Sequence, residues 1–386
     1  MKRQAIYTTH DSDSLTELGR DWNFHDADTS QLLHSLHPYP AKFIPQIPRK
    51  AIQQWSKRGQ LVYDPFCGCG TTLLEAAFLG RSSIGTDSND VAVLVSRAKT
   101  ARYSPTDEAV IRKFLESLGK FEEAPSGSTA HRRLIPTNKN FLYWFSEGVL
   151  DRLALLKQRI GKVPEPARTL LLASFSAILV RASFQDSDTR YARIQRDVKP
   201  ADVNRLFKAK LRDVLSALPE LVSAVRSDAT IYHSDARSVP DVGSDSVDLI
   251  VTSPPYLNAY DYHKYHRQRL HWINGDFEFA RDSEIGSHDE FTRSNATADN
   301  YFTDMDACFA EWSRVLKRGA RCVVVIGDAI VSKAPVQVAD TFVSLLDRRK
   351  ILLESRVIRT LKPTSRAFNV SNSRITHEHV LVLRRA

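Results

Sequence analysis

The sequence has few cysteines and no long apolar segment, and both shortages narrow the class of protein. Four cysteines are too few and too oddly placed for a disulfide framework. Cys67 and Cys69 have no second cysteine or histidine pair at metal-ligand spacing, so no metal is predicted. The longest uncharged apolar run, residues 169–180, is too short to cross a bilayer, and residues 1–13 lack the apolar core of a secretory signal. We therefore expect a soluble, cytoplasmic protein with reduced thiols and no membrane partner.

The composition is that of an ordinary globular protein. Hydrophobic residues make up 42% and charged residues 26% of the 386 positions, and no internal repeat or low-complexity tract is present. This length suits one large α/β domain with an insertion, or two domains. The formal charge of +9 points only weakly to a nucleic-acid partner.

Alternating strand and helix patterns begin at Leu61. A short apolar strand (61–63), a glycine-bearing turn, a helix ending at Gly80, a second strand (82–87) and a second helix (89–101) follow one another. This β-α-β-α rhythm is typical of a doubly wound parallel sheet. Further strands are predicted at 230–235, 247–252, 320–328, 355–361 and 377–385.

The rhythm is interrupted twice, which divides the chain. Residues 103–228 are mainly helical in pattern, with one buried helix predicted in 168–184 and a long amphipathic one in 203–225. We predict a polar N-terminal segment (1–30), an α/β core (31–102 and 229–386), a helical insertion (103–228) that is a candidate for target recognition, and a loop insertion (257–300).

The first turn, DPFCGCGTT (residues 64–72, the glycine turn), has the features of a nucleoside site. Gly68 and Gly70 let the backbone approach a ligand closely, and the helix that follows offers free N–H groups. Asp87 ends the next strand, where a carboxylate can accept both hydroxyls of a ribose. The turn is neither a G-x-G-x-x-G dinucleotide fingerprint nor a P-loop, which argues against a dehydrogenase. A tight turn with a capping aspartate is the plainer alternative.

A second turn, TSPPY, ends the strand predicted at 247–252. Pro254 and Pro255 make it rigid and leave carbonyl groups exposed at the edge where α/β sheets bind ligands. Ser253 and a neighbouring carbonyl are suited to accept hydrogen bonds from an exocyclic amine, and Tyr256 to stack on the ring that carries it. Alternatively, the prolines only terminate the strand and the tyrosine packs in the core.

Together, DPFCGCGTT and TSPPY resemble the amino-methyltransferases of DNA, which use S-adenosylmethionine, and the serine form of the second motif is similar to the cytosine-N4 branch. The segment LHPYPAKFIPQIPRKAI (36–52) resembles the part of this family that closes over the methionine end of the cofactor. The resemblance implies a Rossmann-like methyltransferase sheet and base-holding residues Ser253, Pro254, Pro255 and Tyr256. It implies cofactor contacts at Lys42, Phe43, Asp64, Phe66, Gly68, Gly70, Thr71, Asp87 and, near the adenine, Asp235.

The three motifs follow the order of the family's linear members: cofactor-closing segment, glycine turn, catalytic turn. The resemblance implies double-stranded DNA as the substrate and a role in restriction-modification, with a cognate restriction endonuclease as an optional partner. Methylation of adenine N6, an RNA methyltransferase and a binding protein without catalysis remain the alternatives. Methylation of cytosine C5 is rejected because the TSPPY turn has no cysteine nucleophile.

A base within a duplex cannot reach such a turn, so base flipping is expected. Two cationic segments, 184–212 and 260–272, are candidates to bind the DNA, although a solvated helix face explains the first comparably well. The polar segment 286–300 is expected to be mobile and to become ordered on DNA. The predicted DNA contacts are Arg190, Arg193, Arg196, Tyr260, Tyr262, His263, Lys264 and Arg267.

Overall fold

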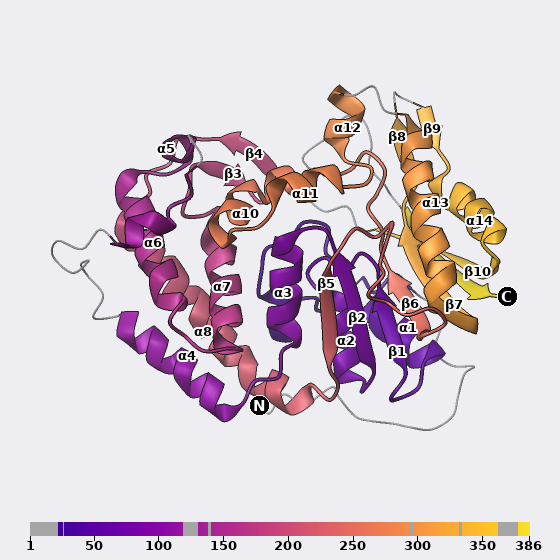
Figure 1. Cartoon of the computed structure of the whole chain (residues 1–386), viewed down its shortest axis with the longest axis horizontal. Coiled ribbons are helices and arrows are strands. Elements are labelled where there is room, and N and C mark those ends of the chain that lie inside the picture. Colours follow the sequence, from indigo (N-terminus) through magenta and orange to yellow (C-terminus); the bar gives the residue numbers. More distant parts are fainter. Residues whose placement is uncertain are drawn as a thin grey trace.

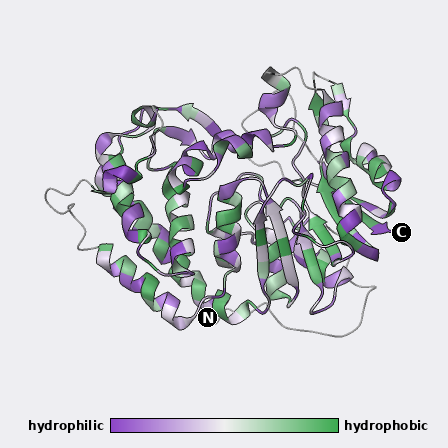
Figure 2. Ribbon diagram, in the orientation of Figure 1, coloured by the Kyte–Doolittle hydropathy of each residue, from purple (hydrophilic) through white to green (hydrophobic). Residues whose placement is uncertain are grey.

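The computed structural model describes residues 22–25, 27–118, 130–137, 140–293, 297–331, 334–361 and 377–386. Within them, a seven-stranded sheet with the strand order β10-β11-β7-β6-β1-β2-β5 forms the centre of the molecule (Figure 1). The predicted polar N-terminal segment falls mostly outside the described residues. Hydrophobic residues are concentrated in the strands of the sheet, and hydrophilic ones are frequent on the outer helices (Figure 2).

The first half of the sheet is parallel and confirms the predicted rhythm. Strand order reverses between β1 and β6. The chain adds β2 and β5 on one side of β1, and it adds β6 and β7 on the other side of β1. Such a reversal is the place where open α/β sheets bind ligands. The elements are α1 (Gln46–Trp55), β1 (Leu61–Asp64), α2 (Thr71–Phe78), β2 (Ser82–Asp87), α3 (Asp90–Thr100), β5 (Ala229–His233) and β6 (Val247–Thr252).

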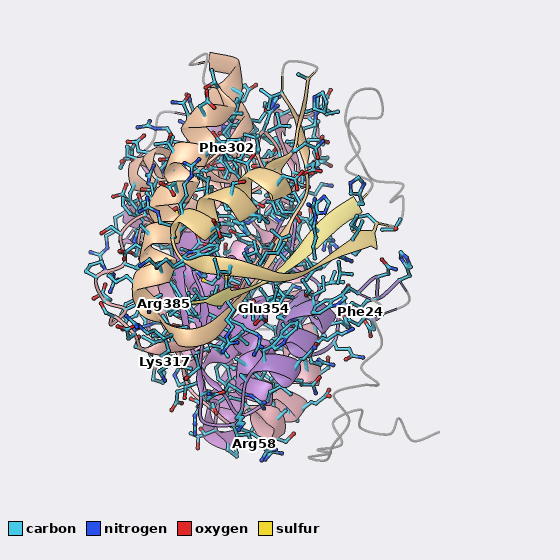
Figure 3. All side chains as sticks on the ribbon, turned by 90° about the vertical axis from the view of Figure 1, so that its right-hand side faces the viewer. Phe24, Arg58, Phe302, Lys317, Glu354 and Arg385 are labelled. Atoms are coloured by element: carbon cyan, nitrogen blue, oxygen red, sulfur yellow. The ribbon has the colours of Figure 1, made fainter. Side chains whose placement is uncertain are left out.

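The second half contains the one described antiparallel strand of the sheet, β11. It pairs antiparallel with both β7 and β10, so β10 forms the edge, which Figure 3 views with Glu354 of β10 labelled. Apolar side chains of α13 and α14 pack on one face of the sheet, and those of α1 pack on the other. The elements are α13 (Ala298–Val315), β7 (Leu316–Ile326), α14 (Val338–Arg348), β10 (Ile351–Thr360) and β11 (His377–Arg385), with a small hairpin of β8 (Ala329–Val331) and β9 (Ala334–Val336).

The segment predicted as a helical insertion lies beside α3 (Figure 1). Its buried side chains form one apolar core that also includes Leu36 and Trp272 from outside the segment. Its elements are α4 (Pro105–Ser117), η3 (Ala130–Leu134), α5 (Phe141–Trp144), α6 (Glu147–Ile160), α7 (Ala167–Ile178), α8 (Pro200–Ala224) and the hairpin β3 (Gln185–Ser187) and β4 (Arg190–Arg193). A short η1 (Leu32–Ser35) precedes α1.

Two local predictions differ from the structure. The buried helix α7 ends at Ile178, six residues before the end of the segment 168–184 in which it was predicted, because the chain turns there into the β3–β4 hairpin. Arg196 holds that turn by donating to the Val180 and Ser183 carbonyls. The described residues of the segment 257–300, predicted as a loop insertion, contain the short helices α9 (Tyr262–Tyr265), α10 (Arg267–Ile273), α11 (Phe277–Asp282) and α12 (His288–Arg293).

Candidate active site

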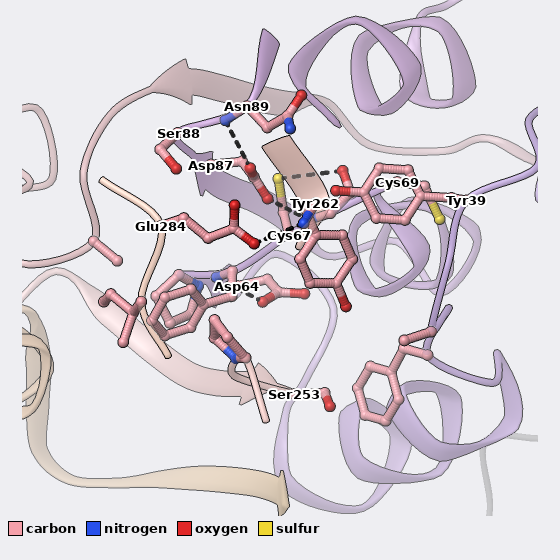
Figure 4. A pocket seen from close by; sticks show the side chains of 18 of the residues that line it. Tyr39, Asp64, Cys67, Cys69, Asp87, Ser88, Asn89, Ser253, Tyr262 and Glu284 are labelled. Carbon is pink, nitrogen blue, oxygen red and sulfur yellow. Dashed lines mark hydrogen bonds between the residues drawn. The ribbon is translucent and has the colours of Figure 1, made fainter. Parts of the chain in front are cut away.

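A pocket opens where β1, β2 and β6 end, at the reversal of strand order (Figure 4). It brings together residues from each of the three sequence motifs and from the segment after the TSPPY turn. The predicted cofactor-binding and base-holding residues that line it are Lys42, Phe43, Asp64, Phe66, Gly68, Thr71, Asp87, Ser253 and Pro255. Gly70, Asp235, Pro254 and Tyr256 are not among the lining residues, although Ser234 and Ala236 are.

The glycine turn needs both of its glycines. Gly68 and Gly70 have φ angles of +50° and +75°, in the left-handed region that side chains disfavour. A Cβ on Gly70 would also lie 2.7 Å from the Ser96 hydroxyl and 2.9 Å from its Cα. The tight turn places α2 directly behind the pocket, with Thr71 as its first residue.

Asp87 organises the turn as well as the pocket. One carboxylate oxygen accepts the Gly68 N–H at 2.9 Å, and the other accepts the Asn89 N–H at 2.9 Å. Burial raises the pKa of Asp87 to about 6, against the pull of these two N–H donors. A carboxylate retains further acceptor positions after two such bonds, so Asp87 can still receive hydroxyl donors from a ligand.

Asp64 connects the glycine turn to the strand before TSPPY. Its Oδ1 accepts the Thr252 hydroxyl at 2.7 Å and the Phe66 N–H at 3.2 Å. Burial raises the pKa of Asp64 to about 6 as well. The two carboxylates therefore lie in a poorly solvated wall, where a positively charged ligand would favour their ionised forms.

Among the other side chains that line the pocket, Tyr39, Tyr262 and Glu284 were not predicted as cofactor contacts. Tyr39, in the segment 36–52, lies against Gly68 and stacks on Tyr262 with ring centroids 5.9 Å apart. Glu284 lines the pocket and accepts the N–H groups of Tyr262 and His263 at 2.7 and 3.0 Å. The aromatic residue in LHPYP was a usable signal for Tyr39, whereas no local pattern marks Glu284.

The TSPPY turn presents Ser253 and Pro255 to the pocket. Tyr256 points toward β11, where its hydroxyl donates to Glu378 at 2.7 Å. Burial raises the pKa of Tyr256 well above its usual value, and the Glu378 carboxylate adds to this, so the phenol stays protonated.

The predicted DNA-binding residues fall into two groups. Arg190 and Arg193 are exposed on the β3–β4 hairpin, whereas Arg196 is half-buried at its base. In the second segment Tyr262 lines the pocket and His263 is buried against Glu284. Lys264 pairs with Asp289 at 2.5 Å. Tyr260 and Arg267 are half-buried, with Tyr260 packed on Tyr262 and Arg267 over the Phe277 ring.

Asp235 lies just beyond β5, between two residues that line the pocket. Its carboxylate pairs with Arg237 at 2.7 Å, and the same guanidinium pairs with Asp304. Asp235 thus fixes the loop at the edge of the pocket, and a direct cofactor contact stays a prediction.

Among the described residues, one group of side chains has metal-ligand spacing: Asp328, His377 and His379, whose ligand atoms lie within 4.8 Å of one another. His379 is hydrogen-bonded to Arg356, whose Nε lies 3.0 Å from Nδ1. That guanidinium charge opposes a cation at this place, so we assign no metal to it.

The pocket suits S-adenosylmethionine by its donor and acceptor set. Asp87 offers acceptors for ribose hydroxyls beside a turn whose glycines leave room for the nucleoside. The lining carboxylates Asp64, Asp87 and Glu284 suit a ligand that carries positive charge. Lys42, at the exposed edge, suits the carboxylate of the same ligand. The residues present therefore fit the cofactor.

The chain is similar to known proteins, among them type II methyltransferases. The type II methyltransferase M.MvaI of Kocuria varians is 26% identical over 296 residues, covering 72% of this chain and 65% of its own. M.MjaII of Methanocaldococcus jannaschii, also a type II methyltransferase, is 21% identical over 78% of this chain and 73% of its own. A solved S-adenosylmethionine-dependent methyltransferase of Methanosarcina mazei matches with a TM-score of 0.34 and 11% identity, covering 86% of this chain and 96% of its own.

In the described part of the chain, no helix has the length and apolar character needed to span a membrane.

The family profile of the N6/N4 DNA methylases matches residues 2–97 and 247–386, which is more than half of the chain and leaves out the helical region between them. This match confirms the resemblance to the amino-methyltransferases and, with it, S-adenosylmethionine as the cofactor of the family. The chain belongs to the DNA methylase family that modifies exocyclic amines.

Proposed function

We propose that this protein transfers the methyl group of S-adenosylmethionine to the exocyclic N4 amine of cytosine in double-stranded DNA. One observation carries the proposal: Ser253 and Pro255 share a single pocket with Asp64, Gly68 and Asp87. A base held by the TSPPY turn would therefore meet the cofactor held by the glycine turn. The chain spans about two thirds of the length of M.MvaI, so activity and substrate are inferred from this geometry together with the family.

When bound, the cofactor supplies an electrophilic methyl group on a sulfonium. The amine of cytosine is a weak nucleophile, because its lone pair is delocalised into the ring. Ser253 and the Pro254 carbonyl accept hydrogen bonds from the two amine protons and draw the nitrogen toward tetrahedral geometry. Most of the rate enhancement would come from this positioning and from the acceptor dipoles around the nitrogen. No cysteine nucleophile or covalent base intermediate is required.

Serine before the two prolines supports cytosine N4 over adenine N6, through the resemblance to the N4 branch. Base flipping would give Ser253 access to the amine, since a paired base keeps its amine inside the duplex. The exposed Arg190 and Arg193 support contact with DNA phosphates from the β3–β4 hairpin. Gln268 of α10 donates to Tyr191 of that hairpin at 3.2 Å, so the hairpin lies next to the segment after TSPPY. A cognate restriction endonuclease remains a prediction from the resemblance.

The test is nucleoside mass analysis of plasmid DNA, and of RNA in parallel, after incubation with the protein and isotope-labelled S-adenosylmethionine. We expect label in N4-methylcytosine from DNA alone, and far less label after the same incubation with a Ser253→Ala variant that still binds the cofactor. Label in N6-methyladenine would refute the choice of base and keep the mechanism. Label in RNA alone would refute DNA as the substrate. No label in either, with cofactor binding intact, would refute the activity.

A further inference from the structure

Two side chains that lie far from the TSPPY turn in sequence make direct hydrogen bonds to it. Tyr301, on α13, donates its hydroxyl to the Pro255 carbonyl at 2.8 Å. Glu378, on β11, accepts the Tyr256 hydroxyl at 2.7 Å. We propose that Tyr301 and Glu378 are positioning residues that hold this turn from two sides and keep Ser253 and the Pro254 carbonyl directed at the target amine. This inference rests on the proposed function.

The Tyr301 bond anchors one of the two proline carbonyls of the turn. Tyr301 is fully buried and its ring stacks on Phe342 with centroids 6.0 Å apart, so its hydroxyl has a fixed direction. A rotation of the turn that exchanged the Pro255 carbonyl with that of Pro254 would break this hydrogen bond. A rigid proline pair transmits this restraint directly to the neighbouring residue.

The Glu378 bond fixes the direction of the Tyr256 hydroxyl. An ionised carboxylate only accepts, so the phenol must donate toward Glu378 and its remaining lone pair points elsewhere. Burial and Glu378 raise the pKa of this phenol, whereas hydrogen bonding with the Ser253 side chain lowers it, as a donating hydroxyl would. When Ser253 donates in that direction, its own oxygen is left as an acceptor, which is the role that the amine requires.

Glu378 is itself held by a buried cation. Its second oxygen pairs with Arg359 of β10 at 2.5 Å, and the two side chains are 13% and 8% exposed. Arg359 also donates to the backbone carbonyl of Trp22 at 3.1 Å. A carboxylate with one oxygen on a buried guanidinium and the other on a phenol has little freedom to move.

The experiment compares Tyr301→Phe and Glu378→Gln with matched controls by single-turnover methyl transfer, with rates normalised to active sites by cofactor titration. Tyr103→Phe removes the same kind of bond elsewhere, since buried Tyr103 donates to the Ala98 carbonyl at 2.7 Å. Glu311→Gln removes a half-buried carboxylate that pairs with Arg314 and accepts the Val239 N–H. We expect the two test variants to be slower by roughly tenfold or more with unchanged cofactor affinity. The two control variants should transfer the methyl group at a rate within twofold of that of the parent protein.

A double variant separates positioning from loss of structure. If Glu378 acts through the Tyr256 hydroxyl, Glu378→Gln should slow Tyr256→Phe no further. Additive losses, or test variants as fast as the controls, would overturn the proposal. If the parent protein methylates nothing, the proposed function fails. The coupling between Glu378 and Tyr256 is then tested by melting temperature. Tyr256→Phe and Glu378→Gln should then lower the melting temperature less together than the sum of their separate effects, and additive shifts would overturn it.

Discussion

The two walls of the pocket are built in different ways. In the glycine-turn wall, the contacts connect residues close in sequence: Gly68 to Asp87 is a span of 19 residues, and Gly68 to Ser96 a span of 28. In the TSPPY wall, Pro255 is held across 46 residues by Tyr301, and Tyr256 across 122 by Glu378. One wall is a local supersecondary unit, whereas the other exists only once the whole sheet has assembled.

Because of this difference, substitutions in the two walls should have different effects. The local wall depends on backbone shape and on one carboxylate, so its failures should appear as lost cofactor binding or lost stability. The assembled wall depends on side chains from α13 and β11, so its failures should appear as a slower methyl transfer with the cofactor still bound. Asp64 joins the two, through its bond to Thr252 across 188 residues.

The largest expected effect is on the TSPPY wall. Ser253→Ala removes an acceptor for the amine and should lower the single-turnover rate by roughly a hundredfold or more, because such preorganised groups act mainly in the transition state. The affinity for S-adenosylmethionine, measured by calorimetry, should stay within twofold. A rate close to that of the parent protein would show that Ser253 does not contact the amine.

A smaller effect is expected on the glycine-turn wall, where the variant should change the affinity for the cofactor rather than the rate of methyl transfer. Asp87→Ala removes the acceptor of the Gly68 N–H and the expected partner of the ribose hydroxyls. It should weaken the affinity for S-adenosylmethionine by roughly ten- to a hundredfold. Asp87→Asn keeps one side-chain oxygen and should lose less. An affinity loss that is equal in both variants would indicate that the charge of Asp87, rather than its acceptors, binds the ligand.

The same contrast explains which features could be predicted from the sequence. The parallel strands and the glycine turn follow from local patterns, so β1, β2 and β6 lie where the sequence places them. Glu378 stands in HEHVLVLRR, a strand pattern that says nothing of Tyr256, and its role depends on β11 pairing with β7. His263 and Lys264 look like DNA contacts in sequence, because no local pattern reveals that Glu284 and Asp289 will pair with them.

A pair of glycines tests how tightly the local wall is packed. Gly70 and Gly59 both have positive φ angles, but a Cβ on Gly59 would meet nothing within 4 Å, whereas one on Gly70 would collide with Ser96. Gly59→Ala should therefore cost only the backbone strain, about 1 kcal/mol in the free energy of unfolding. Gly70→Ala should cost a further 1–3 kcal/mol, roughly the penalty of overpacking, as measured by urea denaturation. Equal losses in the two variants would contradict the close contact of α3 with the turn.

The smallest expected effect is the pH dependence of cofactor binding, which tests the carboxylates shared by both walls. Burial raises the pKa of both Asp64 and Asp87 to about 6 in the free protein. Above pH 7 both are ionised and attract the sulfonium, whereas protonation as the pH falls through 6 removes that attraction. We expect the affinity for S-adenosylmethionine, measured by calorimetry, to fall roughly three- to tenfold between pH 7.5 and 5.

The charge on the ligand provides the control for this measurement. S-Adenosylhomocysteine has the same ribose and adenine but a neutral sulfur, so its affinity should depend less on pH over the same range. Asp64→Asn should reduce the difference between the two ligands, since one of the two titrating carboxylates is gone. An equal pH dependence for both ligands would mean that the acidic wall recognises the ribose hydroxyls or the amino group, and that the positioning of the methyl group depends on the TSPPY wall alone.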